Sequence, residues 1–388
     1  MRLSWLIVAA AACLVVCTAA ATPYVPNDDR IVLERLPEKT DPSLKLMRPL
    51  RARLAAEPGN LDIAASFARR AIDAARELGD PRYLGQAQAA LTPWWTEADP
   101  PTAALLLRAT VKQSQHDFSG ALRDLDRLVA REPTNAQARL TRATVLTVQG
   151  RYADARQDCA ALAQRTSPLV VATCLAAPSS LSGDDAGAYA TLTQQLRVAR
   201  DDVAIRVWSL TLAAEIAARR GDAENAQRRF AEALVLDRDD AYLKAAYADF
   251  LLEQRRPEVA LPLLGTDIRN DSILLRIALA EQALPGAAEA FRMHRADLAA
   301  RFEAAHRRGD FLHQREEARF RLFIENDAQG ALALARQNWS VQREPADLLI
   351  LAQAARATRD ASVLQTVRDW LVASGLHDAT VAAVMEAT

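Results

Sequence analysis

The stretch that decides the fold is Arg108-Ala109-Thr110-Val111, because it returns 34 residues later as Arg142-Ala143-Thr144-Val145. The following aromatic, small and apolar positions keep the same shift, at Phe118 and Tyr152, Ala121 and Ala155, Leu125 and Cys159, and Leu128 and Leu162. A second pair of segments has the same 34-residue shift, with Ala226 and Phe230 matched by Ala260 and Leu264. A fixed period of this length is typical of stacked repeats, in which each unit packs on its neighbours.

The composition favours helices for these repeats. Half of the residues are hydrophobic, many of them alanine and leucine, whereas the chain has only 13 glycines and 9 phenylalanines. Strong helix formers therefore dominate over β-branched and aromatic residues, which predicts an all-α fold.

The repeated residues resemble the pattern of the tetratricopeptide repeat, a helix-turn-helix unit of 34 residues. Gly150 ends a first helix, Tyr152 fills the turn, and Ala155 allows the second helix to approach closely. Pro133 follows the preceding unit, where it stops helical growth. The resemblance implies an all-α, right-handed α-solenoid of tetratricopeptide-like helix-turn-helix repeats.

The repeat phase predicts how the chain is organised. We expect a signal peptide at 1–21, an extended N-terminal arm at 22–42, a divergent helical region at 43–101, the repeat array at 102–274, and divergent C-terminal repeats with a cap at 275–388. A last helix pair should run from about 346 to 374, breaking near Arg359-Asp360 and ending at Gly375. Two helices per repeat give roughly fourteen to eighteen helices in all.

Charge and motifs exclude several classes of function. The chain has 48 basic and 49 acidic residues, so it lacks the excess of positive charge that favours nucleic acids or anionic membranes. It contains no Gly-x-Ser-x-Gly, phosphate-loop, Gly-x-Gly-x-x-Gly or His-Glu-x-x-His motif. We therefore expect no enzyme, no cofactor and no catalytic residues.

The first residues are typical of a secretory signal, with Arg2, an apolar stretch, and the Ala19-x-Ala21 pattern before Thr22. The alternatives are an uncleaved membrane anchor and lipidation near Cys17. Export to the periplasm or cell envelope exposes the two remaining cysteines, Cys159 and Cys174, to oxidation. We predict a disulfide between them; the alternative is two separately buried thiols.

One symmetric group of residues has the spacing of a helical metal site. It consists of Glu303 and His306 before a turn, and His313 and Glu316 after it. If helices flank this turn, Glu303 faces Glu316 and His306 faces His313. Exposed helix ends explain the same residues, so we assign no metal site and keep these four as candidates.

The resemblance also implies a concave groove formed by the first helix of each repeat, which suits a peptide or a helix of a partner protein. Trp208 and Tyr242 would be anchors one repeat apart, although packing between repeats is the alternative. The predicted groove consists of Trp208, Tyr242, Thr110, Gln113, Thr144, Thr147, Glu215, Arg219, Asp249 and Glu253.

These observations favour a non-enzymatic scaffold of the cell envelope that binds another protein or a peptide. One alternative is a structural subunit of an envelope assembly, and a metal-binding accessory protein is another. An enzyme that uses the repeats as a platform would need a catalytic domain, for which the mature chain leaves no room.

The signal sequence gives a direct prediction about the mature protein. Because Ala19-x-Ala21 has the small residues that signal peptidase requires, the native chain should begin at Thr22 and fractionate with the envelope. Intact mass and N-terminal sequencing of the purified native protein check this. A chain that retains Met1 or fractionates with the cytosol would contradict export.

Overall fold

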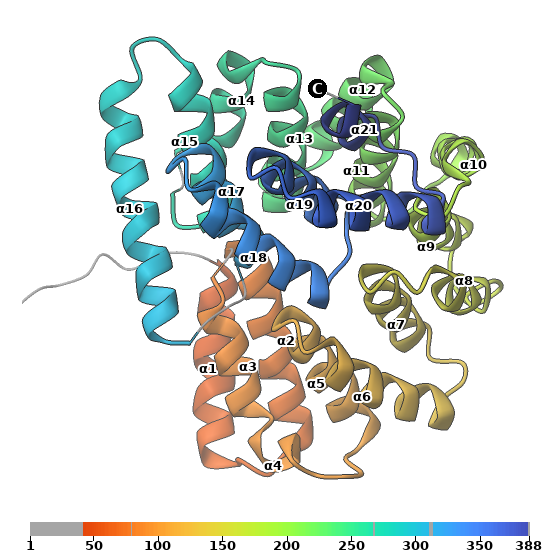
Figure 1. Cartoon of the computed structure of the whole chain (residues 1–388). Coiled ribbons are helices and arrows are strands. Elements are labelled where there is room, and N and C mark those ends of the chain that lie inside the picture. Colours follow the sequence, from red (N-terminus) through yellow and green to blue (C-terminus); the bar gives the residue numbers. More distant parts are fainter. Residues whose placement is uncertain (1–41, 79, 267, 310–312, 387–388) are drawn as a thin grey trace, which may run out of the picture. The chain divides into compact units, whose positions relative to one another are not determined.

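Helices account for the regular secondary structure of the computed structural model, which describes residues 42–78, 80–266, 268–309 and 313–386 (Figure 1). The predicted signal peptide lies outside these residues, as does the predicted N-terminal arm apart from residue 42. None of the helices in the described ranges combines the length and apolar character needed to cross a membrane.

Twenty-one helices follow one another along the described residues, more than the sequence predicts, because elements such as the four-residue α4 are too short to show a period. They are α1 Pro42–Ala56, α2 Leu61–Leu78, α3 Arg82–Ala90, α4 Thr92–Trp95, α5 Thr102–Ser114, α6 Phe118–Arg131, α7 Ala136–Val148, α8 Tyr152–Ala160, α9 Pro168–Ser180, α10 Asp185–Val198, α11 Val203–Arg219, α12 Ala223–Leu236, α13 Ala241–Glu253, α14 Pro257–Leu264, α15 Asp271–Ala283, α16 Ala288–Arg307, α17 Gln314–Phe323, α18 Ala328–Val341, α19 Pro345–Ala357, α20 Ala361–Ser374 and α21 Ala379–Glu386.

From α5 onward the helices form two layers (Figure 1). Each odd-numbered helix contacts the next odd-numbered one, from α5 through α19 to α21. Each even-numbered helix from α6 to α20 packs on the helix that precedes it. This is the arrangement of a helical-repeat solenoid, and the predicted all-α solenoid of tetratricopeptide-type helix pairs is confirmed.

Small residues on the odd-numbered helices allow the close packing of the array. Ala109, Ala143, Ala214 and Ala248 occupy equivalent positions in four repeats, and all are buried. The aromatic rings of Phe118, Tyr152 and Phe230, at the turns or on the second helices, are also buried. The 34-residue pattern therefore marks the core of the array.

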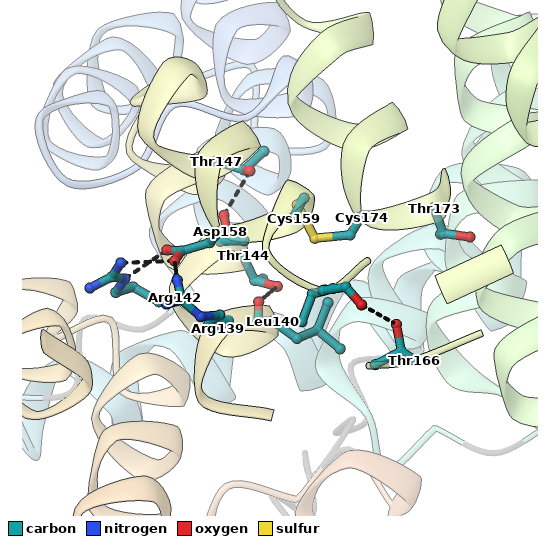
Figure 2. The surroundings of a disulfide bond; sticks show 12 residues. Arg139, Leu140, Arg142, Thr144, Thr147, Asp158, Cys159, Thr166, Thr173 and Cys174 are labelled. Carbon is teal, nitrogen blue, oxygen red and sulfur yellow. Dashed lines mark hydrogen bonds and ion pairs between the residues drawn. A yellow bond between two sulfur atoms is a disulfide. The ribbon is translucent and has the colours of Figure 1, made fainter. Parts of the chain in front are cut away.

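Two buried ion pairs recur with the period of the repeat. Arg108 on α5 makes a bidentate contact with Asp124 on α6, with nitrogen to oxygen distances of 2.8 and 2.6 Å. Arg142 on α7 contacts Asp158 on α8 in the same way, at 2.6 and 2.8 Å (Figure 2). Both carboxylates are almost fully buried, so each pair fixes the two helices of its repeat in one register.

A disulfide links α8 to α9, as the sequence predicts. Cys159 and Cys174 are joined across a Cα to Cα distance of 5.4 Å (Figure 2). Both residues belong to the apolar core that α5 to α9 share. The bridge therefore connects one helix pair covalently to the next.

Removing this bridge should destabilise the array. Changing both Cys159 and Cys174 to alanine should lower the free energy of unfolding by about 3 kcal/mol, because the bridge closes a loop of 15 residues and restricts the unfolded chain. Urea denaturation monitored by circular dichroism measures the change. Reductant should lower the midpoint of the native protein and leave that of the variant unaltered; equal midpoints without reductant would contradict a stabilising role.

Candidate functional site

The predicted groove residues lie on α5, α7, α11 and α13, four helices of the odd-numbered layer. Trp208 on α11 keeps 36% of its surface exposed, and Tyr242 on α13 keeps 65%. Neither aromatic belongs to the buried core of the repeats. Both side chains are therefore available on this layer, one repeat apart.

The threonines of the predicted groove use their hydroxyls within their own helices. Thr110 donates to the carbonyl of Leu106 at 2.9 Å. Thr144 and Thr147 each bond to the carbonyl four residues earlier, at 3.0 and 2.8 Å (Figure 2). Gln113 on the same face is half-buried. This half of the predicted groove therefore offers few free hydroxyl groups.

Polar contacts concentrate on α11 and α13. The hydroxyl of Tyr242 donates to the Glu215 carboxylate at 2.7 Å. Burial raises the pKa of Glu215, and the adjacent Glu215 charge raises the pKa of the Tyr242 phenol well above its usual value. The Tyr242 side chain nevertheless keeps most of its surface exposed.

Charges from the C-terminal helices also face this pair. Glu344, at the start of α19, and Arg315 on α17 act electrostatically on both Glu215 and Tyr242. Glu215 on α11 and Tyr242 on α13 therefore lie within electrostatic reach of residues from α17 and the start of α19, far later in the chain.

Asp249 on α13 is held by two arginines from different helices. Arg276 on α15 bonds one carboxylate oxygen, and Arg319 on α17 reaches the other at 2.8 Å. Burial disfavours the charged carboxylate, but the two guanidiniums outweigh it and lower the pKa of Asp249 to about 2. This predicted groove residue therefore joins three inner helices.

A second charged network surrounds Arg315, and the sequence analysis missed it. Arg315 contacts Glu344 at 2.9 Å and Asp347 at 3.3 Å. Asp347 is fully buried and also accepts hydrogen bonds from Asn338 and Gln342; burial raises its pKa to about 6. The residues are far apart in sequence and belong to the part of the chain where the period is weak, so no sequence pattern connects them.

The two remaining groove residues, at the ends of α11 and α13, contact other helices of the chain. Arg219 donates to the Ser180 hydroxyl at 3.0 Å, which links α11 to α9. Glu253, at the end of α13, accepts a 3.4 Å hydrogen bond from Thr380 on α21. The concave side of the later repeats is thus partly occupied by the chain's own C-terminal helices.

The four candidate metal ligands do not come together. His306 bonds to Glu317 at 2.8 Å instead of facing His313, and the exposed Glu303 pairs with Arg307. Glu316 is buried near Arg315 and Arg276, which lower its pKa to about 2 although burial opposes its ionisation. The predicted pairing of Glu303 with Glu316 and of His306 with His313 was wrong, because helix α17 begins only at Gln314. Within the described residues no group of three potential ligands is positioned for a metal ion.

No protein-family model and no curated protein sequence matches the chain. A tetratricopeptide repeat protein from Parabacteroides merdae is 15% identical over 61% of this chain and 92% of its own, with a TM-score of 0.47. The Cut9-Hcn1 structure is 14% identical over 80% of this chain and 52% of its own, with a TM-score of 0.42. Yeast Tom70 is 11% identical over 84% of this chain and 89% of its own, with a TM-score of 0.36.

Likenesses of this size carry no argument about function. The class of the protein follows from its own features, the 34-residue period and the two layers of paired helices, which define an all-α helical-repeat protein whose units resemble tetratricopeptide repeats.

Breaking the Asp249 contacts should destabilise the array. Asp249→Asn removes a charge that two arginines share, so the free energy of unfolding should fall by about 3 kcal/mol at neutral pH. The pKa of Asp249 is depressed to about 2 in the folded state. Its contribution to the free energy of unfolding is therefore present above its usual pKa and is lost as the pH falls toward about 2.

The matched control for this change is Asp126→Asn. Asp126 also contacts an arginine, Arg142, but its side chain is 64% exposed, so the control should cost less than about 1 kcal/mol. Thermal denaturation at several pH values compares the two. Equal losses would contradict the special role of Asp249.

Proposed function

We propose that this protein is a non-enzymatic scaffold that binds a peptide or a segment of a partner protein on the concave side of its repeats. The observation that carries this proposal is the exposure of Trp208 and Tyr242, two large aromatic residues one repeat apart on adjacent inner helices. Aromatic side chains that are exposed on such a layer are the kind of residue that dominates binding energy at protein interfaces.

The chemistry around these rings suggests the type of segment that would bind. The carboxylate of Glu215 lies beside Tyr242, while the neighbouring Asp249 is already neutralised by two arginines. A lysine or arginine of the partner would pair with Glu215 and pack on the aromatic rings. We therefore expect a partner segment with a basic residue next to an apolar one.

The proposed location is the cell envelope. The signal-like first residues support it, as does the disulfide between Cys159 and Cys174, which suits an oxidising compartment. Function as a stable subunit of an envelope assembly is the alternative, and partners that copurify in fixed stoichiometry would distinguish it.

Site-specific crosslinking tests the proposed binding face. A photoreactive phenylalanine analogue at position 242 should crosslink a partner in living cells, whereas the analogue at Val235 should not, because Val235 is 82% exposed on α12 in the outer layer. Equal crosslinking at both positions would contradict a concave binding site.

Alanine variants give the energetic test. Trp208→Ala and Tyr242→Ala should each weaken binding of the crosslinked partner by about 2 kcal/mol, a loss of roughly thirtyfold in affinity. Calorimetry with the purified partner measures this, and the melting temperature should change little because both residues are exposed. A sharp fall in melting temperature with unchanged affinity would show that the two rings are structural.

A further inference from the structure

The end of the chain returns to the turns of the early repeats. Trp370 on α20 lies against Gly150 in the turn between α7 and α8, and Gly375 lies against Gly183 between α9 and α10. Ala379, the first residue of α21, is close to Gly221 between α11 and α12. We call these contacts, together with the contact of Thr380 with Glu253, the seam.

Glycine is required at position 150 by the contact with Trp370, and not only by the left-handed backbone conformation. Its φ of 75° is left-handed, but His116, Arg255 and Arg359 occupy the same kind of turn with φ of 59°, 56° and 57°. A side chain is therefore tolerated in these turns of the array. At Gly150 a Cβ atom would lie 2.5 Å from the Trp370 ring, so only glycine permits the close approach.

Aromatic and cationic contacts hold the seam on this side. Trp370 meets Trp339 and Tyr152 edge to face, with ring centroids 5.2 and 6.4 Å apart. The guanidinium of Arg343 lies 4.9 Å from the centre of the Trp370 ring, and the Arg343 amide donates to the carbonyl of Val148 at 2.7 Å. These contacts join α18 to α20 with the second helix pair of the array.

The surface beside Trp370 is hollowed. An open pocket of about 350 Å³ lies there, lined by Arg151, Tyr152, Arg156, Ser182, Trp370 and Ser374 among others. The half-buried indole ring therefore borders open space on this side.

Carboxylates face one another on the other side of the seam. Glu253 at the end of α13 meets the start of α21, where Asp378 accepts hydrogen bonds from the amides of Thr380 and Val381 at 3.0 Å. Glu253 also faces Asp249 on its own helix and Arg319 on α17, and Asp378 faces Arg219 on α11. Arg319 is already bound to Asp249, so it neutralises Glu253 only in part.

This environment disfavours ionisation. Although Glu253 is accessible to water, the helices around it remove much of its hydration, and Asp249 and Asp378 add like charge, which together raise its pKa to about 7. Burial also raises the pKa of Asp378. The contacting form of the seam therefore holds protons that separated helices would release.

We propose that α20 and α21 form a gate over the end of the groove lined by Arg219 and Glu253, which is closed in acid and opens as the pH rises toward neutrality. At higher pH the ionised Glu253 and Asp378 repel each other across the seam. The effect on partner access rests on the proposed function, but the movement belongs to the chain alone and can be measured without a partner.

The sign and size of the effect follow from proton linkage. A carboxyl whose pKa is raised in the closed form favours that form fully below its usual pKa, and this preference is lost as the pH rises to the raised pKa. For Glu253 the loss therefore extends from its usual pKa of about 4.5 to about 7. Since Glu253 is partly hydrated, we expect the ratio of open to closed molecules to rise about tenfold between about pH 5.5 and about pH 8.

Hydrogen exchange of the full chain tests the gate. After correction for intrinsic exchange rates, amides of α20 and α21 should lose about tenfold of their protection over this pH interval, while amides of α12 should keep theirs. Unchanged protection of α20 and α21 would overturn the proposal.

Three variants separate the gate from general stability. Glu253→Gln should remove most of the pH dependence and leave α21 protected, and Asp378→Asn should act similarly because asparagine still caps the helix. Trp370→Ala should reduce protection at both pH values. Full pH dependence in Glu253→Gln would overturn the proposal. In the native chain, the expected pH response of α20 and α21 without binding of any partner would instead count against the proposed groove.

Discussion

The fold depends on the close approach of paired helices at positions where only a small side chain fits. Ala109, Ala143, Ala214 and Ala248 hold this position in four repeats and have almost no exposed surface. Because the helices meet so closely there, their long side chains interlock around the alanine, and each pair presents the same apolar faces to the next. The uniform spacing of the pairs, and the layer of inner helices that results, follow from this constraint.

The regular stacking also determines which earlier helices the last part of the chain contacts. Each pair is rotated slightly relative to its neighbour, and the sum of these rotations brings α19 to α21 back to the turns of α7 to α12. The chain's own C-terminal helices therefore cover part of the concave side. Arginines of α15 and α17 neutralise Asp249, while Glu215 and Tyr242 remain next to open space.

Local patterns predicted the features that depend on neighbouring repeats. The period gave the solenoid, the pairing of Cys159 with Cys174, and a last helix pair that ends at Gly375 in a left-handed C-cap. The buried ion pair of Arg142 and Asp158 could also have been predicted, because Arg108 and Asp124 have the same spacing in the sequence. Contacts such as that of Arg319 with Asp249 could not be predicted, since they arise from curvature summed over several units. The metal pattern failed because it assumed a symmetric hairpin where the structure has a different helix start.

The disulfide has a consequence for how the array comes apart. In a linear array each unit is held by its neighbours, so unfolding can begin at an end and advance one interface at a time. Cys159 and Cys174 place a covalent bond across the interface of α8 and α9, and the two helices stay tethered while the bond is intact. Fraying that starts at α1 therefore meets a covalent restraint before it reaches α9 in an oxidising compartment. In a reducing one the same boundary becomes an ordinary interface, and the N-terminal helix pairs can unfold without a covalent barrier.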